Sequence, residues 1–258
     1  MTQKLDRERE IIQSFISLSD RLIDDFDILD LTIQLTEDCA RLLDVAAAGL
    51  LLADPGGTLH LLAATSEQAR SLEVFQLQRE EGPCLDCYQT GKAVSVADLA
   101  EETERWPRFA ASAAQEGFVS VHAIPMRLHD DVLGALGLFG STTGSLNDDD
   151  RNLAQALAHV ASVAILEQNH TVTRSTVLPG LQAAIASRGT LEMAKGVLAE
   201  MHAIEMVEAS ARLRSYARQH DLRLTELARA VVSGEPQPRQ ALLDELGELV
   251  PARLPVRR

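Results

Sequence analysis

The 258-residue sequence has no apolar run long enough to cross a membrane, and its N-terminus is rich in charged residues. A transmembrane helix needs about 20 mainly apolar residues, and a secretory signal needs an apolar segment behind a basic start. Neither pattern occurs in the sequence. We therefore expect a cytoplasmic protein that has no membrane partner.

Patterns that carry enzyme chemistry are also missing. The sequence contains no nucleophile, base and acid at useful spacing and no phosphate-binding loop. It has three cysteines, and its histidines lack the spacing of metal ligands. The sequence thus predicts a protein that is not an enzyme, with no required cofactor and no metal site.

Basic charge is scarce, since 24 Lys and Arg face 38 Asp and Glu and the net charge is −14. The deficit is concentrated in residues 1–177, where 13 basic residues face 28 acidic ones. Residues 178–234 instead carry seven basic and six acidic residues. Contact with an anionic partner depends on the local charge of the surface. This segment is therefore the part of the chain that is best suited to bind such a partner.

Three short helices are predicted within residues 178–234. Apolar residues recur at three- and four-residue steps over 179–202, 206–220 and 224–233. Pro179 suits the first turn of the first helix. Each helix is too short to be stable alone, so we expect the three to pack together. Small residues suit close approach of the helices: Ala194, Gly196, Ala209 and Ala217.

The cations of these helices form one basic flank in this prediction. Arg214 and Arg218 stand four residues apart beside the apolar stripe of the second helix, and Arg212 projects on the other side. Lys195 and the arginines near the third helix extend this surface. An ordinary solvated surface explains the same charges, so spacing alone leaves both interpretations open.

The spacing of this segment resembles that of the ANTAR domain, a three-helix RNA-binding module of bacterial transcription antiterminators. The matching pattern is Arg188-x2-Leu191-x2-Ala194-Lys195-Gly196-Val197-Leu198, Glu208-Ala209-x3-Leu213-Arg214-x2-Ala217 and Arg223-Leu224-x2-Leu227-Ala228-x2-Val231-Val232. The resemblance implies that a dimer of such modules binds a stem-loop in nascent RNA and prevents a competing terminator hairpin. The signature and core positions are then Ala194, Gly196, Ala209, Leu213, Ala217 and Ala228. The candidate RNA-binding residues are Arg188, Lys195, Arg212, Arg214, Arg218, Arg223 and Arg229.

Two positions depart from the usual ANTAR pattern. Ser210 stands where relatives have an aromatic residue, and Ala203 stands where a glycine commonly precedes the second helix. These departures leave a second function open, in which the module serves protein interaction without RNA affinity. A third possible function is that of a DNA-binding regulator, since three small helices also suit helix-turn-helix docking.

The N-terminal part is predicted to be an α+β domain. Helices over 8–24 and 29–43 precede two apolar runs that Asp54-Pro55-Gly56-Gly57 joins as a hairpin. Two further helices, a short strand, another helix and a second hairpin around His129-Asp130-Asp131 follow. This order indicates an antiparallel sheet with helices packed around it.

Residues 25–170 resemble a GAF domain, a sensory fold related to PAS modules. The likeness is carried by Glu81-Gly82-Pro83-Cys84-x2-Cys87-Tyr88-x-Thr90-Gly91, Val96-x-Asp98-Leu99, Arg105-Trp106-Pro107-x-Phe109, Ile124-Pro125-Met126-Arg127-Leu128 and Leu133-Gly134-Ala135-Leu136. The resemblance implies a sensor, for which a small-molecule ligand is possible.

Four residues of this domain are candidates for sensing. Cys84 stands near the start of a short helix, where the helix dipole lowers a thiol pKa, and Cys87 lies three residues on. A redox pair, half of a metal site and two buried structural thiols all fit this spacing. Trp106 and Phe109 fit either a ligand cavity or the ordinary core.

A helix that begins at Asn147 is predicted to connect the two modules and to support a homodimer. Its apolar stripe comprises Leu153, Leu157, Val160, Val163 with Ala164, and Leu166. Pro179 disfavours helix at the preceding residue, so we expect a hinge over 175–180. The predicted organisation is an N-terminal helix (1–24), a GAF domain (25–146), a signalling and dimer helix (147–177), an ANTAR domain (178–234) and a tail (235–258).

Overall fold

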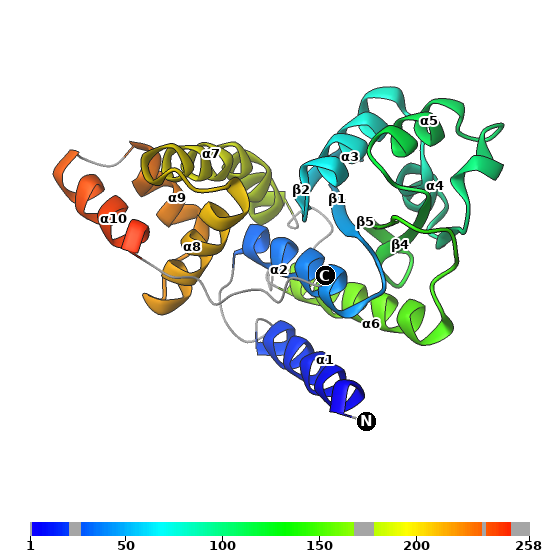
Figure 1. Cartoon of the computed structure of the whole chain (residues 1–258), viewed down its shortest axis with the longest axis horizontal. Coiled ribbons are helices and arrows are strands. Elements are labelled where there is room, and N and C mark those ends of the chain that lie inside the picture. The colour runs from blue at the N-terminus through cyan, green and yellow to red at the C-terminus, as the bar shows by residue number, and fades with distance from the viewer. Residues whose placement is uncertain (1, 21–26, 168–177, 234–235, 249–258) are drawn as a thin grey trace. The chain divides into compact units, whose positions relative to one another are not determined.

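The computed structural model describes residues 2–20, 27–167, 178–233 and 236–248 (Figure 1). The chain divides into two compact units, Met1–Gln182 and Ala183–Arg258. The first unit contains a sheet and helices, whereas the described residues of the second form helices joined by short turns, with no strand among them. Among the helices that the structure describes, none is both long and apolar enough to span a membrane.

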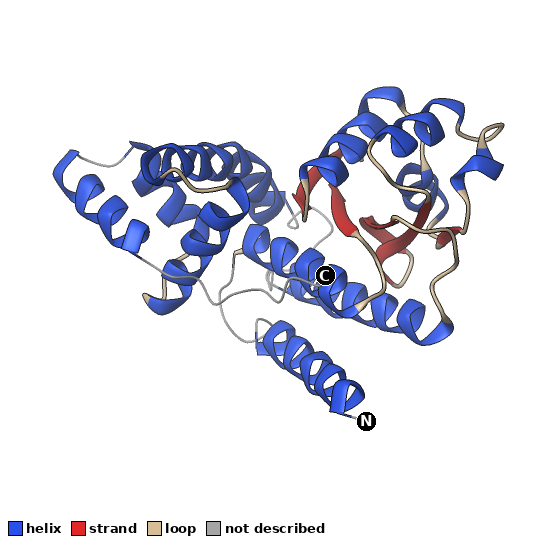
Figure 2. Ribbon diagram, in the orientation of Figure 1, coloured by secondary structure: helices blue, strands red, loops and turns tan. Residues whose placement is uncertain are grey.

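A five-stranded antiparallel sheet forms the centre of the first unit, drawn in red in Figure 2. Its strands lie in the order β2-β1-β5-β4-β3. Both predicted hairpins are present, as β1–β2 and as β4–β5. The strands are β1 (Ala47–Ala53), β2 (Leu59–Ala64), β3 (Val94–Val96), β4 (Ser120–Leu128) and β5 (Asp131–Gly140).

Helices cover both faces of this sheet (Figure 2). Helices α2 and α6 pack on one face, with α1 against both of them, and α3 and α4 pack on the other, with α5 against α3. The bounds are α1 (Thr2–Asp20), α2 (Ile28–Leu42), α3 (Glu67–Arg79), α4 (Pro83–Thr90), α5 (Pro107–Gln115) and α6 (Asp148–Glu167), with a 3-10 turn at Leu99–Glu102. The predicted α+β class and GAF-like layering are confirmed.

Local signals explain where these elements begin and end. The Ser66 hydroxyl accepts a hydrogen bond from the Ala69 backbone N–H at 3.1 Å and caps α3. The Asp54 carboxylate accepts bonds from the backbone N–H groups of Gly56 and Thr58, both at 2.9 Å, and closes the first hairpin. Gly91 ends α4 with φ +64, a left-handed conformation that glycine adopts without strain.

The predicted apolar stripe of α6 is only partly buried, since of its residues Leu157 and Ala164 lie on the fully buried face. Small residues dominate the face against the sheet, while Leu153, Val160, Val163 and Leu166 are only half-buried. The residues of α6 with 1 % exposure or less are Ala154, Leu157, Ala158, Ala161, Ser162, Ala164 and Ile165. An alanine face lets the helix approach the strands closely, which bulky residues prevent.

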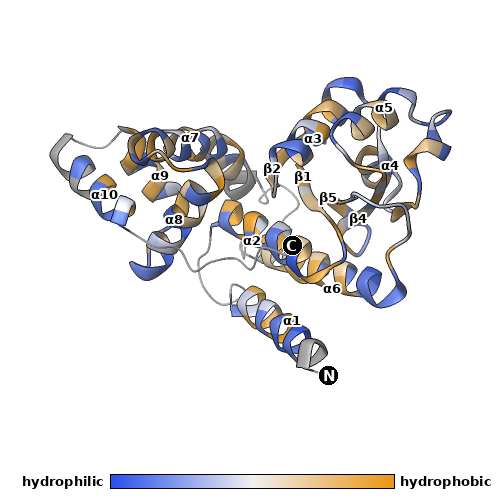
Figure 3. Ribbon diagram, viewed as in Figure 1, coloured by the Kyte–Doolittle hydropathy of each residue, from blue (hydrophilic) through white to orange (hydrophobic). Residues whose placement is uncertain are grey.

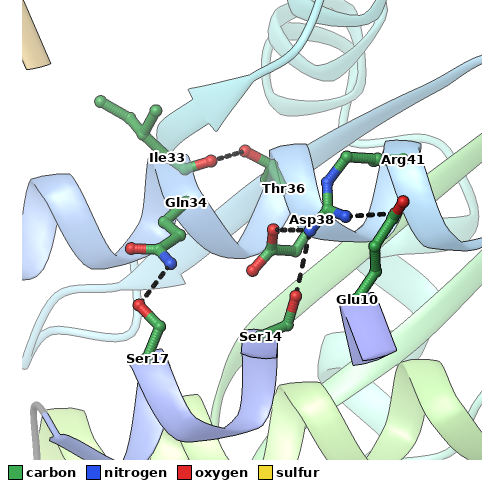
Figure 4. A network of polar contacts seen from close by, with 8 residues as sticks. All are labelled: Glu10, Ser14, Ser17, Ile33, Gln34, Thr36, Asp38 and Arg41. Carbon is green, nitrogen blue, oxygen red and sulfur yellow. Dashed lines mark hydrogen bonds and ion pairs between the residues drawn. The ribbon is translucent and has the colours of Figure 1, made fainter. Parts of the chain in front are cut away.

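Helix α1 begins at Thr2, earlier than predicted, and residues 21–24 of the predicted helix lie outside the described part. Its contact with α2 is polar (Figure 4). The Arg41 guanidinium contacts the Glu10 carboxylate at 2.6 Å, the Asp38 carboxylate at 2.7 Å and the Ser14 hydroxyl at 3.1 Å. The inward side of α1 thus combines these polar groups with an apolar one, since Leu18 is fully buried.

The second unit contains three whole described helices and all of α7 (Leu178–His202) from Ala183 onward; the three are α8 (Met206–Gln219), α9 (Leu224–Ser233) and α10 (Pro236–Glu248). Helices α7, α8 and α9 confirm the sequence prediction, with Pro179 in the first turn of α7. Their apolar stripes, orange in Figure 3, form a shared core that includes Leu191, Leu198, Leu213, Leu227 and Val231. Helix α10 adds a fourth element, which packs against α8 and α9. Residues 175–177 of the predicted hinge lie outside the described part, whereas residues 178–180 are helical and form the start of α7. The prediction of a hinge there is therefore wrong, because the first turn of a helix tolerates proline.

Two helices of this unit end on a left-handed residue that is not glycine. Ala203 has φ +50 after α7, and Asp221 has φ +52 after α8. In each case the backbone N–H of the following residue donates a hydrogen bond to the carbonyl group five residues earlier. These bonds run from Ile204 to Ala199 at 3.1 Å and from Leu222 to Ala217 at 2.8 Å. This is the Schellman arrangement, in which glycine normally supplies the left-handed residue.

Candidate sensing residues and nucleic-acid interface

The two cysteines of α4 are fully buried. They pack in an apolar cluster with Leu51, Leu61 and Ala135 of the sheet. Burial raises the pKa of the Cys84 thiol well above its ordinary value and raises the pKa of Cys87 to about 12. The expectation that the helix dipole lowers the Cys84 pKa is therefore wrong, because desolvation of the thiolate outweighs the dipole. The raised pKa values keep both thiols in the neutral form at physiological pH.

A buried carboxyl group, which the sequence did not single out, stands beside these thiols. Glu73 of α3 has no exposed surface, and burial raises its pKa to about 8. Its Oε1 accepts a hydrogen bond from the Cys84 thiol at 3.6 Å, and its Oε2 accepts one from the Gln76 amide at 2.9 Å. Gln76 in turn accepts from the Cys84 backbone N–H at 2.9 Å.

Two paired glycines of the sheet make room for this carboxyl group. Gly49 of β1 lies opposite Gly137 of β5. A Cβ atom at these positions would stand 2.7 Å and 2.4 Å from Oε1 of Glu73. The signal available in the sequence was therefore a glycine within each of two apolar strands, where glycine otherwise weakens a sheet.

Trp106 and Phe109 belong to the core. Their exposed fractions are 2 % and 0 %, and their rings meet edge to face with centroids 6.3 Å apart. The Arg105 guanidinium lies over the Trp106 ring at 4.2 Å from its centroid. Glu81 accepts hydrogen bonds from the backbone N–H groups of Arg108 and Phe109, at 2.7 Å and 2.9 Å, and so caps the start of α5. Of the two predicted roles, these contacts favour the core.

The seven candidate cations of the helical unit occupy three different environments. Arg214 is buried, with 5 % of its surface exposed, so the predicted pairing with Arg218 on one open flank is wrong. Lys195 contacts Glu192 at 2.9 Å, and Arg212 contacts Glu208 at 3.1 Å. The remaining candidates are the half-buried Arg188 and the exposed Arg218, Arg223 and Arg229.

The predicted core positions are buried with one exception. Ala194, Ala209, Leu213, Ala217 and Ala228 are at most 4 % exposed. Gly196 instead lies half-exposed on α7, and a Cβ atom added there would meet no atom of the described chain within 4 Å. Its small size therefore serves no close helix approach inside this unit.

Models of two protein families match the chain. The model of the GAF domain matches residues 27–166. The chain belongs to the GAF domain family. The model of the ANTAR domain matches residues 180–232, so an ANTAR domain follows the GAF domain in this protein. The comparison with curated protein sequences found no significant match.

Solved GAF domains have a similar fold. The GAF domain of an Acinetobacter phosphoenolpyruvate-protein phosphotransferase is 17 % identical, with a TM-score of 0.50, over 68 % of this chain and 99 % of that one. A GAF domain/HD domain protein from Geobacter sulfurreducens is 18 % identical, with a TM-score of 0.46, over 57 % of this chain and 97 % of that one. At these identities the likeness concerns the fold alone.

The surface of the GAF domain carries an open cleft between the β4–β5 hairpin and α6. Its volume is about 540 Å³, and its lining includes Arg127, His129 and His159 with Asn152 and Gln155. Within the described residues, no group of three or more His, Cys, Asp or Glu side chains is placed to hold a metal ion. The polar lining of this cleft consists of hydrogen-bond donors and amides, with no carboxylate among them.

The ANTAR domain also holds an aromatic pair that the sequence prediction did not assign to the interface. The rings of Tyr216 and His220 stack with centroids 4.1 Å apart and an interplanar angle of 27°. The Tyr216 hydroxyl donates a hydrogen bond to Glu245 of α10 at 2.8 Å. The i, i+4 spacing of an aromatic residue and a histidine was the available signal.

Proposed function

We propose that this GAF–ANTAR protein is a cytoplasmic regulator that binds structured nascent RNA through its ANTAR domain and promotes transcription antitermination. The observation that carries the proposal is the exposure of Arg218, Arg223 and Arg229 on the ANTAR domain. These side chains belong to a segment with seven basic and six acidic residues in a chain of net charge −14. Exposed cations that are not outweighed by neighbouring acidic residues can contact the phosphate groups of an RNA. Such contacts hold the RNA in position on the protein.

The GAF domain controls this output in the proposal. Its interior is filled by Trp106, Phe109, Cys84 and Glu73, all at most 2 % exposed. A small-molecule signal therefore acts at the surface or by displacing this packing. The open cleft lined by Arg127, His129 and His159 suits an anionic compound, since cations and amides bind carboxylates and phosphates.

A homodimer forms part of the same proposal. Ile12 and Ile16 of α1 are 57 % and 48 % exposed and stand one helical turn apart. Val160 and Val163 of α6 are only half-buried. Helices of a second copy would cover such apolar surfaces, as in a helical dimer interface.

Sequencing of the RNA that co-purifies with the native protein tests the proposal. Enrichment of stem-loops upstream of terminators is the expected result. The double variant Arg218→Glu, Arg223→Glu should then weaken binding of an enriched stem-loop and reduce the salt dependence of its affinity. The matched control is Arg9→Glu, Arg108→Glu, which reverses two exposed charges outside the ANTAR domain.

Three outcomes would contradict the proposal. Equal affinity of the folded double variant and the parent would contradict a role for this surface. Tighter binding to duplex DNA than to any hairpin RNA would favour a DNA-binding regulator. Recovery of no enriched RNA would favour a protein-interaction module.

A further inference from the structure

One stripe of α8 combines an aromatic pair with a cation. Arg212, Tyr216 and His220 follow one another at four-residue steps, so their side chains share one side of the helix. Tyr216 is the only Phe, Tyr or Trp residue between positions 178 and 258. Its ring stacks on the imidazole of His220, which is exposed. The ANTAR domain therefore concentrates its aromatic surface at a single place.

This arrangement fits an unpaired base of an RNA loop. Proteins recognise RNA loops mainly through splayed-out bases that stack on Tyr, Phe, Trp or His rings. The Arg212 guanidinium lies one helical turn away, and its Nε and Nη2 contact Glu208 of the same helix, so its Nη1 is the donor that suits the phosphate next to such a base. A duplex offers no free base face to this pair, so the chemistry selects a single-stranded loop.

In the structure, the C-terminal half of α10 lies on this stripe. The Tyr216 hydroxyl donates to the Glu245 carboxylate at 2.8 Å. Nη1 of Arg212 donates to the Leu246 carbonyl at 3.4 Å and also to the Gly247 carbonyl. The end of a helix carries partial negative charge on its free carbonyl groups. Helix α10 thus offers the stripe a carboxylate and carbonyl oxygens where an RNA would offer phosphate oxygens.

Apolar contacts hold α10 in this position. Leu243 and Leu246 are 1 % and 0 % exposed. Nε2 of His202 lies 3.0 Å from the Leu243 carbonyl, and the His202 ring lies so close to Gly247 that an added Cβ would come within 2.1 Å of it. The helix has one basic residue, Arg239, against three acidic ones. A negatively charged helix seated on a cationic and aromatic stripe competes with any RNA for that stripe.

We propose that Tyr216 and His220 form the stacking site for one unpaired loop base of a hairpin RNA, that Arg212 binds the adjoining phosphate, and that α10 occupies this site until RNA displaces it. The inference rests on the proposed RNA-binding function and adds the site and its competitor. Because only the open state binds, the apparent affinity is lowered in proportion to the fraction of closed chains.

The test uses the full chain and one RNA probe. The probe is a hairpin enriched from a random-loop RNA library by the Glu245→Gln chain, with 2-aminopurine substituted at each loop position in turn. Glu245→Gln removes the charge that holds Tyr216, and Asp244→Asn is its matched control, since Asp244 contacts Gln240 and not the stripe. Tyr216→Phe keeps the ring but loses the bond to Glu245, whereas Tyr216→Leu keeps apolar bulk but loses the ring.

The variants are expected to separate into two groups. Glu245→Gln and Tyr216→Phe bind the probe several-fold more tightly than the parent, while Asp244→Asn binds as the parent does. Tyr216→Leu binds about 5- to 100-fold more weakly, the effect of losing one stacked base. At one loop position the 2-aminopurine fluorescence is quenched by the parent and by Tyr216→Phe but not by Tyr216→Leu.

The failures of the inference and of the proposed function are distinguishable. Binding of the probe by Tyr216→Leu with the affinity and quenching of the parent would overturn the stacking site. No gain in affinity for both Glu245→Gln and Tyr216→Phe would overturn the role of α10. In both cases RNA binding itself would stand. If the library yields no hairpin for any of these chains, the proposed function fails together with the inference.

Discussion

The Cys84 thiol donates a hydrogen bond to the Glu73 carboxyl group, with 3.6 Å between Sγ and Oε1, at a place from which water is excluded. The pair lies between α3, α4 and the glycines of the sheet. It joins a neutral thiol to a carboxyl group whose pKa of about 8 keeps it largely protonated at neutral pH. This carboxyl group therefore gives the stability of the GAF domain a dependence on pH.

Glu73→Gln should remove this pH dependence. The folded pKa of about 8 exceeds the ordinary value of 4.5, so between these values the folded chain holds a proton that the unfolded chain has lost. The free energy of unfolding of the parent therefore falls as pH rises from 4.5 to 8, by up to about 3 kcal/mol at pH 7. Glutamine keeps the shape and is neutral throughout.

Urea unfolding of the GAF domain at several pH values measures this effect. The variant should equal the parent near pH 4.5 and exceed it at pH 8. Glu104→Gln, an exposed change of the same kind, controls for the loss of one acidic residue from the net charge. If the free energy of unfolding changed with pH in the same way for Glu73→Gln and the parent, the result would show that the domain tolerates the ionised carboxylate in its interior.

Cys84 and Cys87 should resist alkylation in the folded protein. Both are fully buried with raised pKa values, so the reactive thiolate is rare and inaccessible. Iodoacetamide at neutral pH, followed by mass spectrometry, should label them only after denaturation. Rapid labelling of either residue in the native protein would instead support a redox-responsive pair.

Ala203→Gly should stabilise the ANTAR domain. Ala203 has φ +50, where an alanine Cβ is strained and glycine is not. Relief of this strain should raise the free energy of unfolding by about 1 kcal/mol. Thermal unfolding followed by circular dichroism checks the change, with Ala186→Gly, at an exposed position inside α7, expected to lower the melting temperature. A lower melting temperature for Ala203→Gly would contradict the prediction.

Gly196→Ala should also stabilise the ANTAR domain. The position is helical, and an added Cβ meets no atom of the described chain within 4 Å. Alanine in a helix interior is favoured over glycine by about 1 kcal/mol. The same unfolding experiment measures the gain. Destabilisation at high protein concentration, but not at high dilution, would reveal a close contact between copies of the chain at this position.

Much of the fold could be predicted because its signals are local. The Asp54-Pro55-Gly56-Gly57 hairpin, the Ser66 cap and the three-residue and four-residue repeats of α7–α9 act within a few residues. The buried face of α6 was predicted only in part, because alanines give little periodic contrast beside leucines and valines.

The site was less predictable because its properties depend on tertiary burial. The Cys84 pKa follows from the surroundings of the thiol, and not from the helix start that the sequence shows. The burial of Arg214 and the openness of Gly196 depend on how α7, α8 and α9 pack. The sequence showed residues 235–258 only as a tail, and the contacts of α10 with Arg212 and Tyr216 required the structure.

The polar contacts of α1 decide where an isolated sensor fragment can begin. The family match starts at residue 27, yet Arg7 donates to the Leu42 carbonyl at 3.1 Å and forms an ion pair with Asp150. Only 4 % of the Asp150 side chain is exposed. A fragment cut at the family boundary would strip a buried carboxylate of its cation, a loss that destabilises a protein strongly. A fragment that retains its first 20 residues keeps that cation in place.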